Sequence, residues 1–134
     1  MADSKFFTTQ RKPNIIAGEY STVFHTLAEA SSAVYPQGTV LVMDETTGKL
    51  KVFSSDTAAK ANYDLYILLE DEVTADKDKK VSVITRGTIN AGALVLNKST
   101  DKLTTAVNGC QIEGWLRNKF DLIHFENRDN IIKE

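Results

Sequence analysis

The chain has 134 residues, 42% of them hydrophobic, and a formal net charge of −2, which fit one globular domain with a modest core. The near-neutral charge and the scattered basic residues argue against a dedicated nucleic-acid-binding protein, because such proteins usually carry a basic excess. A single cysteine excludes an intrachain disulfide. The chain has neither an apolar run of ~20 residues nor a start that resembles a signal peptide, so we expect a protein made in the cytoplasm without a membrane partner.

The N-terminal segment has no sustained hydrophobic period, and Pro13 interrupts any regular element there. The run Phe6-Phe7-Thr8-Thr9 suits an extended conformation, because aromatic and β-branched residues favour strands. We therefore interpret residues 1–18 as an arm, residues 19–126 as a β-rich domain and residues 127–134 as a polar tail.

Three short elements are predicted next. Residues 20–27 alternate between apolar and polar side chains, which predicts a strand. Residues 28–33, rich in alanine and serine, favour a short helical turn. Pro36 and Gly38 then mark a turn over residues 35–38.

The centre of the domain is predicted to be a β-hairpin. Residues 40–43 are apolar at every position, which indicates a central strand buried on both faces. Residues 44–48 contain a glycine and are typical of a hairpin loop. Residues 49–53 then alternate, so we expect Leu50 and Val52 to face inward.

Two more strands follow the hairpin. Residues 65–69 predict another buried strand, and residues 81–86 predict an alternating one, with a solvated charged turn at residues 74–80 between them. Gly87 and Gly92 follow no phosphate-loop pattern. Near a strand end, a glycine more often marks a bulge or a tight bend.

Towards the C-terminus the hydrophobic period becomes helical. Residues 107–120 place these apolar residues on one helical face: Ile112, Trp115, Leu116 and Phe120. Asn108 is positioned to cap this helix with Gln111 as its capping-box partner, whereas Gly114 costs the helix about 1 kcal/mol relative to alanine. Residues 122–125 predict a last strand.

Residues with chemical potential form no recognisable catalytic or metal-binding pattern. His25 and His124 lack the Cys/His/Asp/Glu spacing of a metal site, which favours a role on strand surfaces or in the core. Cys110 stands at a predicted helix start but has no local Cys-His signature, which favours a structural cysteine over a nucleophile. The acidic cluster at residues 70–72, near Asp76 and Asp78, lacks EF-hand spacing. We expect no enzyme, metal or cofactor.

One ordered series of motifs resembles a known family. It consists of Gly38-Thr39-Val40-Leu41-Val42-Met43-Asp44, Lys49-Leu50-Lys51-Val52-Phe53, Leu68-Leu69-Glu70-Asp71 and Arg86-Gly87-Thr88-Ile89-Asn90-Ala91-Gly92-Ala93-Leu94. In this order the series is similar to the head decoration proteins of tailed bacteriophages, the family of phage lambda head decoration protein D. The motifs cover less than half of the chain.

The resemblance implies a fold and a function. The fold would be mainly β with minor α: a small β-sandwich or barrel-like (β-tulip-like) domain with a short C-terminal helix and an extended N-terminal arm. The protein would form homotrimers at local three-fold positions on the outside of the phage head and stabilise the expanded shell against internal DNA pressure. The arm would add a strand to the major capsid protein, and we expect the contact to be made by Lys5, Phe6, Phe7, Thr8 and Thr9.

The alternative interpretation is a small OB-like β-barrel that binds single-stranded nucleic acid. Such a module needs a basic groove with exposed aromatic side chains on which bases stack. Phe53, Tyr63 and Tyr66 are candidates for that role, although the net charge argues against it.

Overall fold

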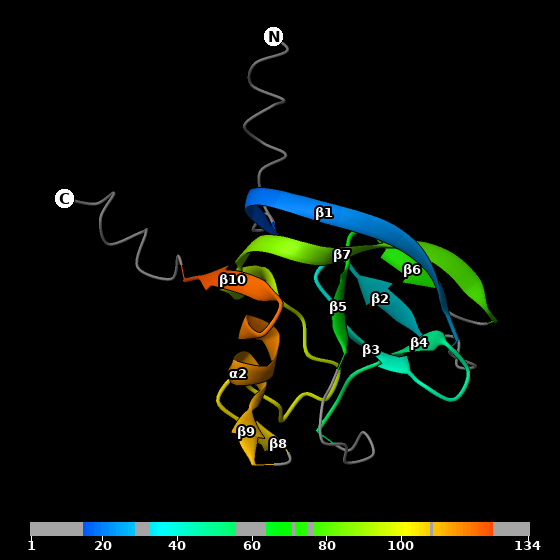
Figure 1. Cartoon of the computed structure of the whole chain (residues 1–134). Coiled ribbons are helices and arrows are strands. Elements are labelled where there is room, and N and C mark those ends of the chain that lie inside the picture. The colour runs from blue at the N-terminus through cyan, green and yellow to red at the C-terminus, as the bar shows by residue number, and fades with distance from the viewer. Residues whose placement is uncertain are drawn as a thin grey trace, which may run out of the picture.

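The computed structural model describes residues 15–28, 33–55, 64–70, 72–74, 77–107 and 109–124. These residues form ten strands, a short 3-10 helix and one α-helix, drawn in Figure 1. The elements are β1 (Ile16–Leu27), β2 (Val34–Pro36), β3 (Val40–Asp44), β4 (Lys49–Val52), β5 (Leu65–Leu68), β6 (Glu72–Thr74), β7 (Lys79–Asn90), η1 (Ala91–Ala93), β8 (Ala106–Val107), β9 (Cys110–Gln111), α2 (Ile112–Arg117) and β10 (Phe120–Ile123).

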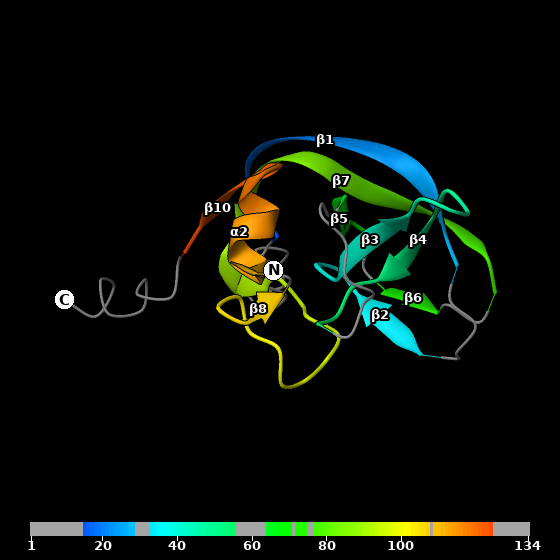
Figure 2. The same ribbon diagram turned by 60° about the horizontal axis from the view of Figure 1, so that its bottom comes forward.

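The main sheet of the described chain closes on itself. Its strand order is β1-β4-β3-β5-β7-β10, and β1 also pairs with β7, so five strands form a ring that β10 extends. Figure 2 shows β1 and β7 arching side by side over the other strands of the ring, with α2 and β10 at one end. The expectation of a mainly β, barrel-like domain with a short C-terminal helix is confirmed.

Alternation along the strands gives the ring two separate cores. Side chains such as Leu41 and Val83 fill the interior of the ring, where β2 and β6 also contribute. Side chains one position away, such as Val40 and Ile84, point to the opposite face and pack with α2. Because successive side chains of a strand point to opposite faces, a strand between two cores must be apolar at every position. This explains the predicted and observed central place of β3.

The predicted hairpin is also confirmed. β3 pairs antiparallel with β4, and residues 45–48 form the turn between them. Leu50 is buried inside the ring, whereas Lys51 is exposed. The predicted buried strand at residues 65–69 corresponds to β5, which is buried along its whole length.

The first strand begins earlier than the sequence predicted. The sequence places residues 15–18 in the arm, whereas β1 starts at Ile16, and Ile15 is buried with its carbonyl accepting a hydrogen bond from the backbone N–H of Asn90 at 2.9 Å. The register between β1 and β7 shifts between Ile16 and Tyr20, which interrupts the alternation that sequence patterns detect. The predicted helical turn at residues 28–33 lies mostly outside the described residues.

The predicted helix is shorter than its hydrophobic pattern suggested. It spans residues 112–117, because residues 106–111 form the β8–β9 hairpin instead. The turn of this hairpin contains the dipeptide Asn108-Gly109, and Gly109 has a φ of 84°. Asn-Gly is a strong signal for a two-residue hairpin turn. Gln111 precedes the helix but makes no capping hydrogen bond through its side chain, and Asn108 lies outside the described residues.

The last strand lies two residues earlier than predicted. β10 begins at Phe120, which is buried, and runs parallel to β7 from Gly87 to Asn90. The buried indole N–H of Trp115 donates to the Val107 carbonyl at 2.9 Å and so connects α2 to the β8–β9 hairpin. The apolar residues of the predicted helix face are therefore buried, although they come from both a helix and a strand.

Candidate functional site

The predicted contact residues Lys5, Phe6, Phe7, Thr8 and Thr9 lie outside the described residues. The described structure shows how the chain enters the domain after them. Ile15 is only 1% exposed, and Ile16 pairs with Ile89 of β7. The point at which the predicted arm joins the domain is therefore fixed by the core and by the sheet.

The most exposed apolar surface of the described chain lies on β1. The large apolar side chains that are exposed in the described residues are Tyr20 (48%), Val23 (39%), Phe24 (68%) and, on β2, Val34 (51%). In that part of the chain, β1 pairs along one edge with β7, and its other edge meets β4 at Leu27 alone. Within the described ranges, the opposite edge of β1 thus has no strand partner along most of its length, and it lies at the periphery in Figure 1.

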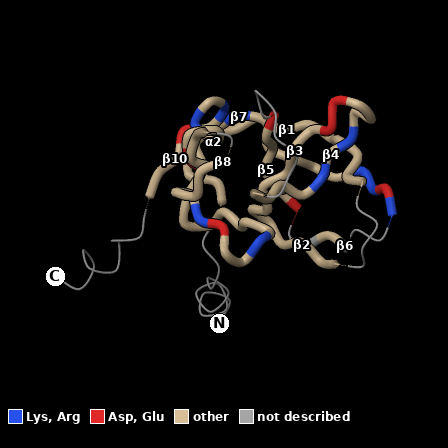
Figure 3. The backbone as a smooth tube through the Cα atoms, turned by 90° about the horizontal axis from the view of Figure 1, so that it is seen from below, with Lys and Arg blue, Asp and Glu red and all other residues tan. Residues whose placement is uncertain are grey.

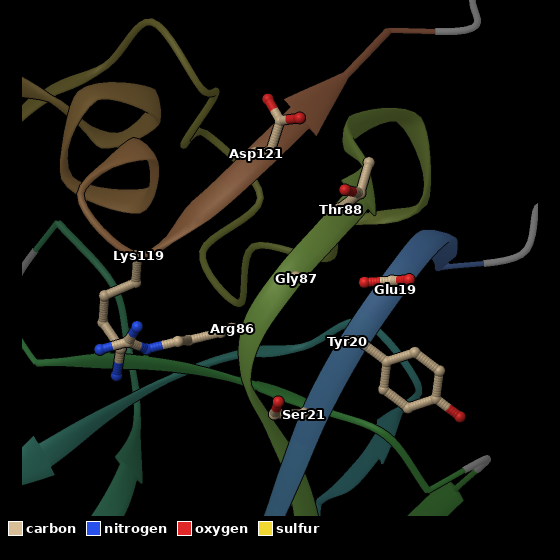
Figure 4. Close-up of a pocket in the computed structure, with 8 residues that line it drawn as sticks. All are labelled: Glu19, Tyr20, Ser21, Arg86, Gly87, Thr88, Lys119 and Asp121. Carbon is tan, nitrogen blue, oxygen red and sulfur yellow. The ribbon is translucent and has the colours of Figure 1, made fainter.

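A polar hollow of about 430 Å³ lies beside this strand (Figure 4). It is lined by Glu19, Tyr20, Ser21, Arg86, Gly87, Thr88, Lys119 and Asp121. Gly87 has a φ of 143°, and a Cβ atom there would lie 2.6 Å from the Glu19 carbonyl oxygen. The position therefore requires glycine, which confirms the expected irregularity at this point of the sheet. The lining combines both charge signs and contains neither histidine nor cysteine.

A cluster around Tyr66 joins β1, β5 and the turn before β10. The Tyr66 hydroxyl donates to Asp64 at 3.1 Å, and the Lys119 ammonium lies 2.9 Å from the same carboxylate and 3.7 Å from the centre of the Tyr66 ring. His25 packs edge-on against that ring at 5.1 Å. Burial, and then the Asp64 carboxylate, raise the pKa of Tyr66 to about 12. This cluster is structural, and His25 fills the packing role that the sequence indicated.

The other chemically active residues also have local partners. His124 lies 3.4 Å from Glu113. The pKa of Glu113 is held below its ordinary value, mainly by a hydrogen bond from Arg117 and to a smaller extent by His124, although desolvation acts in the opposite direction. The Cys110 thiol donates to the Gln111 carbonyl oxygen at 3.4 Å. In the described residues, no hydrogen bond joins Cys110 to a histidine, so the structure brings together no nucleophile and base.

The acidic segment contributes to sheet structure. Glu70 accepts a hydrogen bond from the Ser82 amide at 2.8 Å, and Asp78 forms an ion pair with Lys49 at 2.6 Å. The described residues contain no group of three or more His, Cys, Asp or Glu side chains placed to hold a metal ion. Within the same ranges, no helix has the length and apolar character needed to cross a bilayer.

Two of the three stacking residues proposed for the nucleic-acid alternative are not accessible in the structure. Phe53 and Tyr66 are buried, so they cannot stack on bases, and Tyr63 lies outside the described residues. Figure 3 shows basic and acidic residues interspersed along the described backbone. An OB-like binding face needs exposed aromatic side chains within a basic groove, and these residues do not provide one.

Comparison with known families identifies the chain. Residues 16–112 match the family of Bacteriophage lambda head decoration protein D. The match extends from the first residue of β1 to the first residue of α2, so it includes the complete strand ring and well over half of the chain. This protein belongs to the phage lambda head decoration protein D family. No individual curated protein matches it.

Family membership defines the general role. Head decoration proteins are structural rather than enzymatic, and they are located on the virion capsid. The protein is therefore a component of a phage head.

Proposed function

We propose that this protein binds the outer surface of the phage head at local three-fold positions and stabilises the expanded shell against the pressure of packaged DNA. The observation that carries the proposal is the family match over the whole strand ring. The protein would act mechanically, by connecting neighbouring capsomers, without a cofactor or nucleic-acid partner. It would be made in the host cytoplasm and join the shell there.

We further propose that the protein acts as a homotrimer, on the basis of the family. Apolar strands and an aromatic helix face could give a second argument if a single chain left them uncovered. The structure removes that argument, because Leu41, Trp115 and Phe120 are already buried within one chain. In a trimer, three weak capsid contacts reinforce one another, because each first contact raises the effective concentration of the others.

The capsid contact is proposed to lie in the arm, at Lys5, Phe6, Phe7, Thr8 and Thr9. An extended segment of this composition can add a strand to an exposed sheet edge of the major capsid protein, where backbone hydrogen bonds give affinity and alternate side chains give specificity. Ordering the backbone costs about 1–2 kcal/mol per residue. The contact is therefore expected to form on the capsid partner.

Deletion of residues 1–14 tests the arm. The truncated protein keeps Ile15 and the complete ring, so it should remain folded while losing its binding to heads. Truncated and full-length protein are incubated with undecorated expanded heads, and the heads are pelleted. Equal co-sedimentation of the two proteins would show that the globular domain alone provides the binding surface.

A second assay tests stabilisation directly. Heads filled with DNA are heated with and without the full-length protein, and DNA release is followed with an intercalating dye. Decorated heads should release DNA at a higher temperature than bare heads. Identical release curves at saturating protein would contradict a stabilising role.

A further inference from the structure

The outer edge of β1, defined here as residues 20–26 on the side away from β7, offers free backbone groups. In an antiparallel pair, alternate residues direct their N–H and C=O groups away from the partner strand. No strand covers this edge within the described residues, since the pairing with β4 is confined to Leu27. From Thr22 to Leu27 the pairing with β7 continues without a bulge, so the strand is regular there.

Apart from a register shift between Ser21 and Thr22, this edge lacks the usual protection against strand addition. Natural edge strands carry lysine, proline or bulges that prevent pairing with other chains. Residues 20–26 contain no lysine, arginine or proline, and their single histidine, His25, packs against Tyr66. The exposed apolar side chains Tyr20, Val23 and Phe24 lie on the same segment. An unprotected apolar edge of this kind is typical of a surface that a partner covers.

We infer that the outer edge of β1 receives an extended segment of the major capsid protein, as a second contact beside the arm. This inference rests on the proposed function. Thr9, the last proposed arm contact, is six residues from Ile15, so the chain between them spans at most about 20 Å. An arm bound to the capsid therefore holds the start of β1 close to the capsid surface.

The association of this family with the phage capsid favours the capsid protein over a second copy as the occupant. Two β1 edges that pair with each other are related by a two-fold axis, because each contributes the same surface. Such a pair does not fit a three-fold assembly.

Charge placed on the edge tests the inference in the full-length protein. Phe24→Lys puts a charge at a side chain that is 68% exposed, so folding should be preserved while strand addition is blocked. Val34→Lys is the matched control, because Val34 is a similarly exposed apolar residue on β2. We expect the Phe24 variant to bind undecorated expanded heads at least about tenfold more weakly than the Val34 variant, which corresponds to about 1.4 kcal/mol.

The possible outcomes separate this inference from the proposed function. If Phe24→Lys binds as the control does, while deletion of residues 1–14 abolishes binding, the edge contact is wrong and the arm contact stands. If the full-length protein itself fails to bind heads, the proposed function is wrong. If Phe24→Lys instead lowers the mass of the free protein in sedimentation, the edge contacts another copy and the inference is overturned. Thr22→Lys replaces Phe24→Lys if the latter does not fold.

Discussion

Gly87 is the position in the ring where a single methyl group should have the largest effect. A Cβ atom there would lie 2.6 Å from both the Glu19 carbonyl oxygen and the Tyr20 Cβ, and the φ of 143° is strained for any L-residue. Gly48 also has a positive φ, of 73°, but a Cβ there meets nothing within 4 Å. Substitution of Gly48 therefore tests backbone strain alone, whereas substitution of Gly87 tests strain together with the close approach of β1 to β7.

We predict that Gly87→Ala lowers the free energy of unfolding by about 3 kcal/mol or more, because strain and overlap add. Gly48→Ala should lower it by about 1–2 kcal/mol, from backbone strain alone. Denaturant unfolding of both variants measures the difference. Equal losses would mean that β1 and β7 can separate at Gly87 without penalty.

Tyr66 should ionise at higher pH than an exposed tyrosine. Its pKa is raised to about 12 from the ordinary value of 10.0, by burial first and by Asp64 second. The neutral phenol is thus favoured in the folded state, so its contribution to stability is complete below pH 10 and is lost as the pH rises from 10 towards 12.

Absorbance at 295 nm during an alkaline titration tests this assignment. The folded protein should show a late phase that disappears in Tyr66→Phe and moves to lower pH in Asp64→Asn. A late phase that persists in Tyr66→Phe would assign the raised pKa to another tyrosine.

At the scale of single elements, Gly114 of α2 packs closely against Cys110 of β9. A Cβ atom at Gly114 would lie 2.7 Å from the Cys110 Sγ, the contact that α2 makes there beyond its own backbone and the neighbouring residues. The sequence indicated that Gly114 weakens the helix. The structure gives a reason for glycine at this position, because the Cys110 thiol of β9 lies too close to leave room for a Cβ atom.

A double-mutant cycle measures this coupling. Gly114→Ala should destabilise the native protein by about 1 kcal/mol or more through overpacking. In a Cys110→Ala background the same change should stabilise it by about 0.5–1 kcal/mol, since alanine favours the helix. Free energies of unfolding of the four proteins give the coupling energy. Additive effects would show that the thiol and Gly114 do not compete for space.

The elements that the sequence predicted well are those with a regular pattern. The continuous apolar run of β3 and the alternation of β4 identify a hairpin. A strand buried on both faces is apolar at every position, and a strand buried on one face alternates between apolar and polar residues. The start of β1 was missed because a bulge breaks the alternation before Tyr20. The helix was predicted too long because Ile112 and Phe120 share a helical spacing although Phe120 belongs to β10. The Asn108-Gly109 dipeptide was the signal that could have corrected it.

At the scale of the whole molecule, sequence alone identified the family but not the surface on β1. The short motifs between residues 38 and 94 were sufficient for the resemblance, and the match over residues 16–112 confirms it. The exposure of Tyr20 and Phe24 depends on which strands pair with β1, and that is decided by ring closure between residues far apart in the chain. Alternation predicts a strand, but it cannot show that one edge stays open.

The ring connects the start of β1 to much of the main sheet. Each of its strands is hydrogen-bonded to neighbours, and β7 connects β1, β5 and β10 in one continuous element. A force applied at the start of β1 would reach β5 and β10 through their shared partner β7. This arrangement suits a protein that is proposed to hold neighbouring capsomers together.

The central claim is that this protein decorates the outside of an expanded phage head at local three-fold positions. A cryo-electron microscopy reconstruction of undecorated expanded heads, recorded before and after saturation with the full-length protein, tests it most directly. We expect added density on the outer surface at the local three-fold positions, with β1 on the side that faces the shell. Saturated heads without added density, or with density confined to other positions, would contradict it.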